Sequence, residues 1–186
     1  MKTQKKKKII FVCTGNTCRS PMAEAIFRQK ITDLGLTVLQ ISSAGLKVQK
    51  KEKMNEKTAQ VLLEKGFQPL SFSSKQITEK MLVQSLAIVC MTDVQRDFVM
   101  DMRWNALRAV GEENIENNVY SFKDITGYEI VDPYGKDIEC YRYVYELIAG
   151  GMSLLIDKIL PKEIWKKYVP RPRKKKTEDQ KQKGDI

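Results

Sequence analysis

The feature that most constrains this chain is one stretch near its amino terminus, Phe11-Val12-Cys13-Thr14-Gly15-Asn16-Thr17-Cys18-Arg19-Ser20-Pro21. The apolar run just before it, 9–12, indicates a short buried strand. Pro21 suits the first turn of a helix, and the apolar residues after it recur at helical spacing. The cysteine therefore lies where a strand ends, and the arginine where a helix begins. Backbone N–H groups and the helix dipole both favour negative charge in such a loop, which predicts an anion site over 14–18.

The residues at the two ends of this loop predict phosphoryl transfer. An ordinary cysteine thiol has a pKa near 8.5, so only about 3% of it is thiolate at pH 7. Amide donors, the helix dipole, Arg19 and the Ser20 hydroxyl all favour a thiolate at Cys13, which can then attack without a base. The same amides and the planar fork of Arg19 are suited to hold the three oxygens of a phosphoryl group.

The leaving group of such a reaction must be protonated as it departs, which requires a carboxylic acid near the loop. Asp132 is the best candidate, because Pro133 restricts it to extended conformations and so aims its side chain. The same residue would then act as the base on the water that completes hydrolysis. Three other acids lie on or near the same predicted loop and stay open as alternatives: Asp124, Glu129 and Asp137.

Histidine is absent and cysteine is sparse, which excludes several classes of chemistry. Without histidine there is no Ser-His-Asp or Cys-His catalysis, and most transition-metal sites are disfavoured, so we expect neither metal nor cofactor. Four cysteines without a CxxC pair indicate neither a secreted disulfide scaffold nor a zinc site. Cys90 and Cys140 are expected to be buried structural thiols. Cys18 either fills space or closes a reversible disulfide with oxidised Cys13, which would make the loop redox-sensitive.

The positive charge of the chain is concentrated at its ends. Five lysines in 1–8 and a net +4 in 171–186 leave +1 of the total +10 for 9–170. We therefore expect a disordered basic leader over 1–8, one folded domain over 9–168 and a disordered basic tail over 169–186. Solvated tails are favoured over a nucleic-acid role, so nucleic acid is expected to make at most weak contacts with the basic termini.

No apolar run approaches the roughly 18 residues of a membrane span, and the amino terminus lacks the apolar segment of a signal peptide. These two observations predict a soluble, cytoplasmic protein without a membrane span.

Predicted strands alternate with predicted helices along the folded domain. We expect strands over 9–13, 36–43, 86–91 and 119–122, helices over 20–34, 54–65, 78–84, 93–103 and 138–160, and a loop over 123–136. Gly150 and Gly151 are expected to weaken or bend the last helix, and Trp165 and Tyr168 to dock back on the domain. This alternation predicts an α/β fold: a single domain with a four-stranded parallel sheet, helices on both faces, and a phosphate-binding loop after the first strand. Ligands of such sheets bind beyond the carboxyl ends of the strands, where Cys13 is expected.

Taken together, these motifs resemble the low-molecular-weight protein tyrosine phosphatase family over about residues 9–160. The matching stretches are 12–24, Ser43-Ala44-Gly45 and Asp132-Pro133-Tyr134-Gly135. The resemblance implies a metal-free enzyme that acts on phosphorylated proteins, with Cys13 as nucleophile, Arg19 as phosphate clamp and Asp132 as general acid. It further implies that Ser20 hydrogen-bonds the thiolate and that Asn16 and Ser43 brace the loop. The remaining residues of the phosphate-binding loop are Thr14, Gly15, Thr17 and Cys18, and Tyr134 either walls the substrate cleft or merely packs.

Thr17 bears on the substrate. Tyrosine-directed members of the family usually carry an aliphatic residue at this place, against which an aromatic substrate packs. The chain resembles the bacterial protein-arginine phosphatases in carrying threonine in a Cys-Thr-Gly-Asn-Thr-Cys-Arg-Ser loop. A hydroxyl suits a polar guanidinium leaving group and would help to position the attacking water. The resemblance therefore favours phosphoarginine, with phosphotyrosine as the alternative.

Three other functions compete with a phosphatase. The loop also resembles that of thiol-dependent arsenate reductases. Such an enzyme needs a pair of resolving cysteines near Cys90, and Cys90 stands alone in this chain. A non-catalytic module that binds phosphorylated ligands would not need Cys13, Arg19 and Asp132 together. A nucleic-acid-binding protein that acts through its basic ends would bind in a salt-dependent way, and its binding would survive Cys13→Ser.

Overall fold

The structure is a computed structural model that describes residues 8–160, except 37, 69–70 and 113–116. The leader up to residue 7, the tail, Trp165 and Tyr168 lie outside the described residues, so the expectations about them stay predictions. Lys8, which we assigned to the leader, is the first residue of a strand.

Four parallel strands form a single sheet in the order β2-β1-β3-β4. The strands are β1 (Lys8–Cys13), β2 (Gln40–Gly45), β3 (Ser85–Cys90) and β4 (Val119–Ser121). β1 has a partner on each side, and every residue of it after Lys8 is buried. A strand buried on both faces requires a continuous apolar run, which is what the sequence carries at 9–12. The predicted four-stranded parallel sheet is confirmed.

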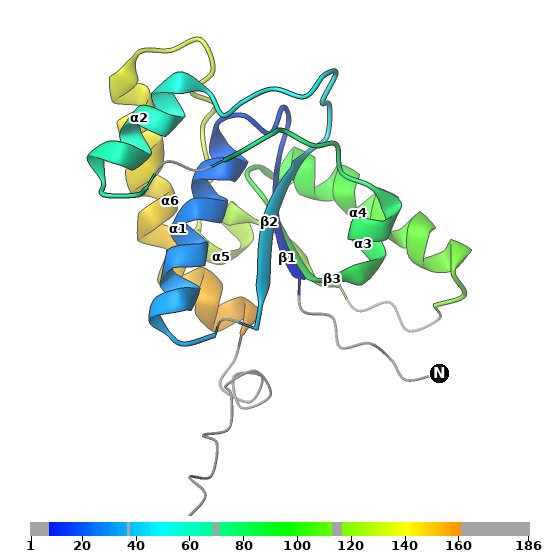
Figure 1. Ribbon diagram of the computed structural model, residues 1–186. Coiled ribbons are helices and arrows are strands. Elements are labelled where there is room, and N and C mark those ends of the chain that lie inside the picture. Colours follow the sequence, from blue (N-terminus) through cyan, green and yellow to red (C-terminus); the bar gives the residue numbers. More distant parts are fainter. Residues whose placement is uncertain (1–7, 37, 69–70, 113–116, 161–186) are drawn as a thin grey trace, which may run out of the picture.

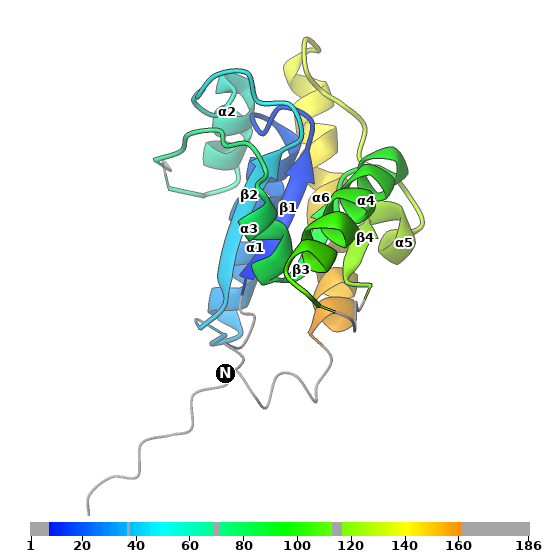
Figure 2. The same ribbon diagram turned by 90° about the vertical axis from the view of Figure 1, so that its right-hand side faces the viewer.

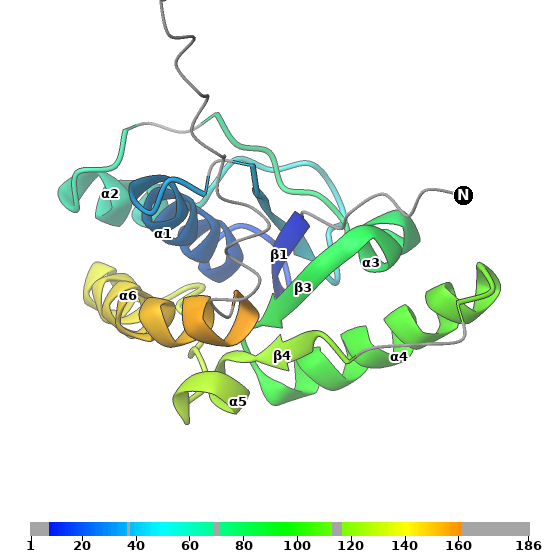
Figure 3. The ribbon, with the colours of Figure 1, turned by 90° about the horizontal axis from the view of Figure 1, so that it is seen from below.

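Helices cover both faces of this sheet (Figure 3). One face carries α1 (Arg19–Asp33), α2 (Glu56–Glu64), α5 (Phe122–Thr126) and α6 (Ile138–Ile159), and the other carries α3 (Glu79–Gln84) and α4 (Asp93–Ala109). Alternate side chains of β1 enter two separate cores: Ile9 and Phe11 face α1 and α6, whereas Ile10 and Val12 face α3 and α4. In the described part of the chain, no helix is long and apolar enough to cross a membrane.

The second strand was predicted at 36–43, but it begins only at Gln40 and runs to Gly45. The apolar residues before it close α1 instead of extending the sheet. Gly35 adopts a positive φ of 71°, and the Leu36 N–H donates to the Ile31 carbonyl oxygen at 3.0 Å. Leu36 is thereby buried in the core at the end of the helix, so its apolar character does not indicate a strand.

The prediction of a loop over 123–136 is wrong at the start of that range, because α5 occupies Phe122–Thr126. A reciprocal capping box begins this helix: Ser121 Oγ accepts from the Asp124 N–H at 3.0 Å, and the Ser121 N–H donates to Asp124 Oδ2 at 2.8 Å. The helix predicted at 93–103 is also longer than expected and continues to Ala109.

Gly150 and Gly151 do not end α6, which runs unbroken through both. A Cβ atom at Gly151 would lie 2.7 Å from the ring of Phe122 and 2.8 Å from the methyl group of Thr126. The missing side chain therefore lets α5 pack closely against α6, which explains a glycine inside a helix despite its cost there.

Candidate active site

The segment between β1 and α1, Thr14–Cys18, is here named the β1–α1 loop. It lies at the carboxyl edge of the sheet, between the segment that joins β2 to α2 and the segment that leads into α6 (Figure 2). Thr14 is exposed and Gly15 half-buried, whereas Asn16 and Cys18 are buried. Because α1 starts at Arg19, the loop stands directly before a helix of fifteen residues, where the amide groups and the dipole favour an anion.

The sulfur of Cys13 has two hydrogen-bonding partners beside it. It lies 3.0 Å from Ser20 Oγ and accepts from the Asn16 backbone N–H at 3.3 Å. Ser20 Oγ itself accepts from Asn16 Nδ2 at 2.9 Å, and its hydroxyl hydrogen has two acceptors within reach, the sulfur at 3.0 Å and the more distant Ala44 carbonyl oxygen at 3.5 Å. Both groups are placed to donate hydrogen bonds to the sulfur.

Asn16 holds the turn of the loop. Among the described residues it is the one non-glycine with a positive φ, at 56°, a conformation that asparagine tolerates better than most residues. Its Nδ2 donates to the hydroxyls of Ser20 and Ser43, both at 2.9 Å, and its Oδ1 accepts from the Lys75 N–H at 2.9 Å. Ser43 in turn donates to Glu24 Oε2 at 2.6 Å. This buried amide is therefore satisfied on both sides, and it joins the loop to β2 and α1.

Arg19 is buried, with 4% of its surface exposed, and faces the segment before α6. Its Nη2 lies 2.6 Å from Asp132 Oδ2, and its Nη1 donates to the Ile130 carbonyl oxygen at 3.3 Å. Its Nε is buried and has no partner among the described residues. A buried donor without an acceptor is costly, so this atom is available to an anion such as phosphate.

Asp132 is half-exposed at the mouth of the site, so that one carboxylate oxygen contacts Arg19 while the group still faces solvent. Its other oxygen, Oδ1, accepts from the Tyr134 N–H at 3.2 Å. The Ile130 N–H donates to the Met91 carbonyl oxygen at 3.0 Å, which anchors this segment to the sheet edge. Tyr134 is 70% exposed on the rim.

The three alternative acids are engaged elsewhere. Asp124 lies 2.5 Å from Arg96, Glu129 accepts from the backbone N–H of Asp93, and Asp137 caps α6. Of the four acids considered, the structure brings only Asp132 to Arg19.

Cys18 differs from Cys13, although both are buried and free. Its sulfur lies 3.6 Å from Thr17 Oγ1 and 3.7 Å from the Tyr141 hydroxyl. Burial raises the pKa of the Cys18 thiol, so it stays protonated at neutral pH. Burial also raises the pKa of Tyr141, which keeps its hydroxyl neutral. Of the two cysteines in this region, Cys13 is the one whose sulfur has a backbone N–H and a hydroxyl group beside it at 3.3 and 3.0 Å.

Sequence reasoning missed two residues that support the loop. The side chain of Gln95, on α4, is buried and donates from Nε2 to Thr14 Oγ1 at 3.1 Å, while its Oε1 accepts from the Met91 N–H at 3.1 Å. Glu24, on α1, orients Ser43. Nothing local in the sequence marks Gln95, because β3 and α4 bring it to the loop from 81 positions away.

Comparisons with known proteins match the chain to one family. The family described as "Low molecular weight phosphotyrosine protein phosphatase" matches residues 8–167. The protein-arginine-phosphatase of Bacillus subtilis is 32% identical over 137 residues, which cover 72% of this chain and 84% of that protein. The low molecular weight protein-tyrosine-phosphatase PtpB of Staphylococcus haemolyticus is also 32% identical, over 141 residues that cover 75% of this chain and 90% of that protein.

Among solved structures, the YwlE arginine phosphatase of Geobacillus stearothermophilus superimposes with a TM-score of 0.70 and 26% identity, covering 86% of this chain and 96% of that one. The family match spans the sheet, the β1–α1 loop and the segment that carries Asp132. The chain belongs to the low-molecular-weight phosphotyrosine protein phosphatase family and is a cysteine-dependent protein phosphatase.

Proposed function

We propose that this enzyme hydrolyses phosphoarginine in proteins through a cysteinyl-phosphate intermediate. The observation that carries the proposal is the site itself: Cys13 Sγ faces the Ser20 hydroxyl, and Arg19 connects the loop to Asp132. In the first step the Cys13 thiolate attacks phosphorus, and the bond between phosphorus and the guanidino nitrogen breaks. The proton of an Asp132 carboxylic acid passes to the departing nitrogen.

The contact between Arg19 and Asp132 places the general acid beside the phosphate clamp. The guanidinium lies 2.6 Å from the carboxylate. A phosphoryl dianion that takes over the donors of Arg19 removes this partner and places negative charge beside Asp132. The carboxyl group of Asp132 is then released from Arg19 and can turn toward the departing nitrogen, to which it donates its proton.

The second step reverses the role of Asp132. Its carboxylate accepts a proton from water as the water attacks phosphorus, the sulfur–phosphorus bond breaks, and Cys13 leaves as a thiolate with inorganic phosphate as product. The hydrogen bonds from Ser20 and the Asn16 N–H stabilise that leaving thiolate, as they do the attacking one. Cys18 stays a thiol throughout in this proposal.

Thr17 supports arginine as the phosphorylated residue. It is half-buried in the β1–α1 loop, and its hydroxyl offers a hydrogen-bonding group rather than an apolar surface. A hydroxyl suits a planar, polar guanidinium better than an aromatic ring. The similarity to two proteins named as protein-arginine-phosphatases points the same way.

Phosphotyrosine is the second candidate substrate. PtpB of Staphylococcus haemolyticus is as similar as the Bacillus relative and is named a protein-tyrosine-phosphatase. The exposed ring of Tyr134 on the rim could stack on an aromatic substrate. We also propose that the enzyme acts in the cytoplasm, because its four cysteines are free thiols, which a reducing compartment preserves.

The test is a comparison of kcat/KM on two peptides of one sequence, phosphorylated on arginine or on tyrosine. We expect the phosphoarginine peptide to be preferred, and we expect Thr17→Ile to move the ratio toward phosphotyrosine. Thr17→Ser, which keeps the hydroxyl, is the matched control and should retain the preference. A wild-type preference for phosphotyrosine, or a ratio that Thr17→Ile leaves unchanged, would overturn the arginine assignment.

A further inference from the structure

We propose that the segment after β2, residues 46–53, binds acidic side chains that flank the phosphorylated residue of the substrate. We name this segment the lysine loop, because four of its eight residues are lysine and one is glutamate. The inference rests on the proposed function as a protein phosphatase, and it adds a substrate class: phosphorylated sites in acidic sequence.

Main-chain hydrogen bonds attach the lysine loop to the catalytic site at both of its ends. The Leu46 N–H donates to the carbonyl oxygen of Cys13 at 3.0 Å, and the Lys47 N–H to that of Thr14 at 2.9 Å. Just beyond the far end, the Asn55 N–H donates to the carbonyl oxygen of Thr17 at 3.0 Å. The lysine loop thus runs along the carboxyl edge of the sheet beside the β1–α1 loop (Figure 1).

Contacts with residues 74–76 fix the path of the lysine loop between these ends. The Val48 N–H donates to Gln76 Oε1 at 2.8 Å, and Gln76 Nε2 donates to the Leu46 carbonyl oxygen at 2.9 Å. Further along, Glu52 and Ser74 exchange two hydrogen bonds of 2.8 Å, one in each direction. The backbone is therefore held without help from the lysine side chains.

The lysine side chains themselves are exposed and almost without acidic partners. Over the described ranges, the one ion pair of the loop joins Lys50 to Glu52 at 3.7 Å, and both groups are largely exposed. No described acid lies within ion-pair distance of Lys47, Lys51 or Lys53. Ordinary surface charge on soluble proteins mixes both signs. A stretch with four lysines and one glutamate beside the site, in a body of nearly zero net charge, attracts anionic ligands.

The basic edge continues toward the general acid. Lys57, at the start of α2, donates from Nζ to the carbonyl oxygen of Lys136, four residues after Asp132. Lys136 is exposed, with no acidic partner among the described residues. Lysines therefore continue along the rim from the lysine loop to the segment of Asp132, with the exposed Glu56 among them.

An acidic peptide is the occupant that fits this edge. An extended chain advances about 3.3 Å per residue, so three or four residues on either side of the phosphorylated one span about 10–13 Å. That length is sufficient to leave the β1–α1 loop and pass over a loop bonded directly to it. Carboxylates on the peptide would meet lysines that no internal acid neutralises.

The test compares peptides that carry the same phosphorylated residue between acidic, neutral or basic flanks. Each kcat/KM is divided by the value for p-nitrophenyl phosphate, which has no flanks, and is measured at about 0.01 M and about 1 M ionic strength, where the Debye lengths are about 30 Å and 3 Å. Lys47→Gln/Lys51→Gln is compared with Lys30→Gln/Lys158→Gln. The second pair removes the same charge from the last turns of α1 and α6, at the opposite edge of the sheet.

For the wild type at low salt we expect acidic flanks to raise the ratio by about five-fold over neutral ones, as for a few exposed ion pairs, and high salt to remove most of this gain. The Lys47→Gln/Lys51→Gln protein should lose at least half of the gain, and the control pair should keep it. Equal ratios for all three flanks, or equal losses in both variants, would overturn the proposal. The proposal would also be overturned if the Lys47→Gln/Lys51→Gln protein lost binding to a single-stranded oligonucleotide while its discrimination among the three peptides stayed unchanged.

Failure of the proposed function gives a different result: the wild type would turn over none of the phosphorylated peptides, whatever their flanks. Turnover that is indifferent to the flanks would contradict only the role of the lysine loop.

Discussion

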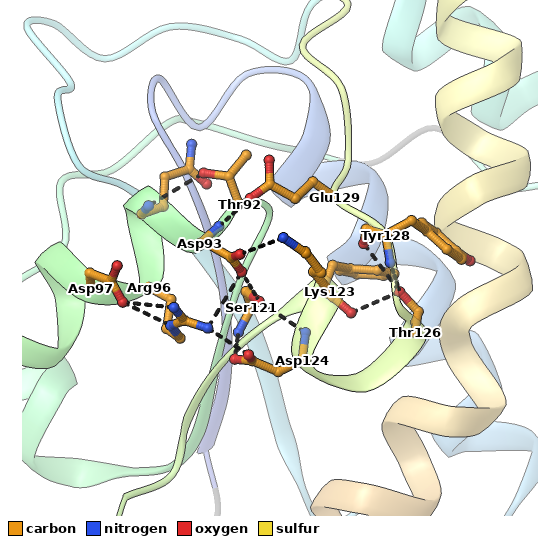
Figure 4. Close-up of polar contacts among 12 residues, drawn as sticks. Thr92, Asp93, Arg96, Asp97, Ser121, Lys123, Asp124, Thr126, Tyr128 and Glu129 are labelled. Atoms are coloured by element: carbon orange, nitrogen blue, oxygen red, sulfur yellow. Dashed lines mark hydrogen bonds and ion pairs between the residues drawn. The ribbon is translucent and has the colours of Figure 1, made fainter.

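The two sides of the active site carry their charges in opposite ways. On the side of α4 and α5, six polar residues bind one another in a charge-paired cluster: Asp93, Arg96, Asp97, Ser121, Lys123 and Asp124 (Figure 4). The guanidinium of Arg96 alone contacts three carboxylates, at 3.4, 2.9 and 2.5 Å. On the side of β2, the lysine loop leaves its charges almost without internal partners.

This difference shows which groups hold each side together. In the charge-paired cluster the side chains connect α4 to α5, for Ser121 Oγ donates to Asp93 Oδ1 at 2.6 Å and Lys123 Nζ to Oδ2 at 3.1 Å. In the lysine loop, hydrogen bonds of the main chain hold the segment in place, and the lysine side chains are free to contact other partners. We therefore expect the charges of the first side to stabilise the fold and those of the second to bind the substrate.

The largest effect is expected at Asp132, the acid whose cationic partner is also the proposed clamp of the substrate. Asp132→Asn should lower kcat on a phosphoarginine peptide by about two to four decades, because the departing nitrogen is no longer protonated. The fall on p-nitrophenyl phosphate, with its better leaving group, should be smaller in a single-turnover measurement of the first step.

Asp137→Asn is the matched control, since Asp137 caps α6 and does not contact Arg19. If both variants lost activity equally, or if Asp132→Asn slowed both substrates alike in that step, Asp132 would not be the general acid.

A stability effect is expected next, at the centre of the charge-paired cluster. Arg96→Met keeps much of the side-chain length but leaves three carboxylates facing one another, which should lower the free energy of unfolding by about 1–2 kcal/mol. Urea unfolding followed by circular dichroism measures this change. An unchanged midpoint would show that the cluster contributes nothing to the fold.

A smaller stability effect is expected on the other side. Lys47→Gln/Lys51→Gln should change the free energy of unfolding by less than about 0.5 kcal/mol, because exposed charges without partners contribute little. The same urea experiment applies. A destabilisation as large as that of Arg96→Met would contradict this difference between the two sides, because it would show that the lysines contribute to the stability of the fold.

The smallest effect is expected in the pH dependence of the charge-paired cluster. The Ser121 hydroxyl and the Lys123 ammonium hold the pKa of the Asp93 carboxyl below its usual value. A lowered folded-state pKa stabilises the protein above the ordinary aspartate pKa, near 3.9, and this contribution is lost as the pH falls through the folded value. The stability difference between wild type and Asp93→Asn should therefore shrink below about pH 4. A difference that stays constant from pH 7 to pH 3 would contradict the pairing.

Elements that depend on neighbouring residues in the sequence could be predicted, and those that depend on contacts between distant segments could not. The β1–α1 loop follows from an apolar strand, a short polar loop and Pro21, all within a dozen residues. The short helix α3 was predictable because Thr78 marks its start, and the structure confirms Thr78 as its cap. By contrast, Leu36 is apolar because it is buried at the end of α1, and periodicity alone cannot separate that role from a place in a strand.

In the site, the candidates Cys13, Arg19 and Asp132 were found because their chemistry is unusual and their neighbours are local. Gln95 and Glu24 were missed because glutamine and glutamate are ordinary on a helix surface, and only the packing of α4 and α1 turns them toward the β1–α1 loop and Ser43. The lack of acidic partners for Lys47, Lys51 and Lys53 among the described residues also could not be predicted from the sequence, because it depends on which acidic side chains the fold brings near them.

The central claim is that the sulfur of Cys13 takes the phosphoryl group. Asp132→Asn, mixed with p-nitrophenyl phosphate, rapidly quenched and analysed by peptide mass spectrometry with fragmentation, tests it most directly, because hydrolysis of the intermediate is slowed. We predict a phosphoryl group on Cys13 in Asp132→Asn, and no adduct in the double variant that also carries Cys13→Ala. An adduct on any other residue, or turnover that survives Cys13→Ala, would contradict it.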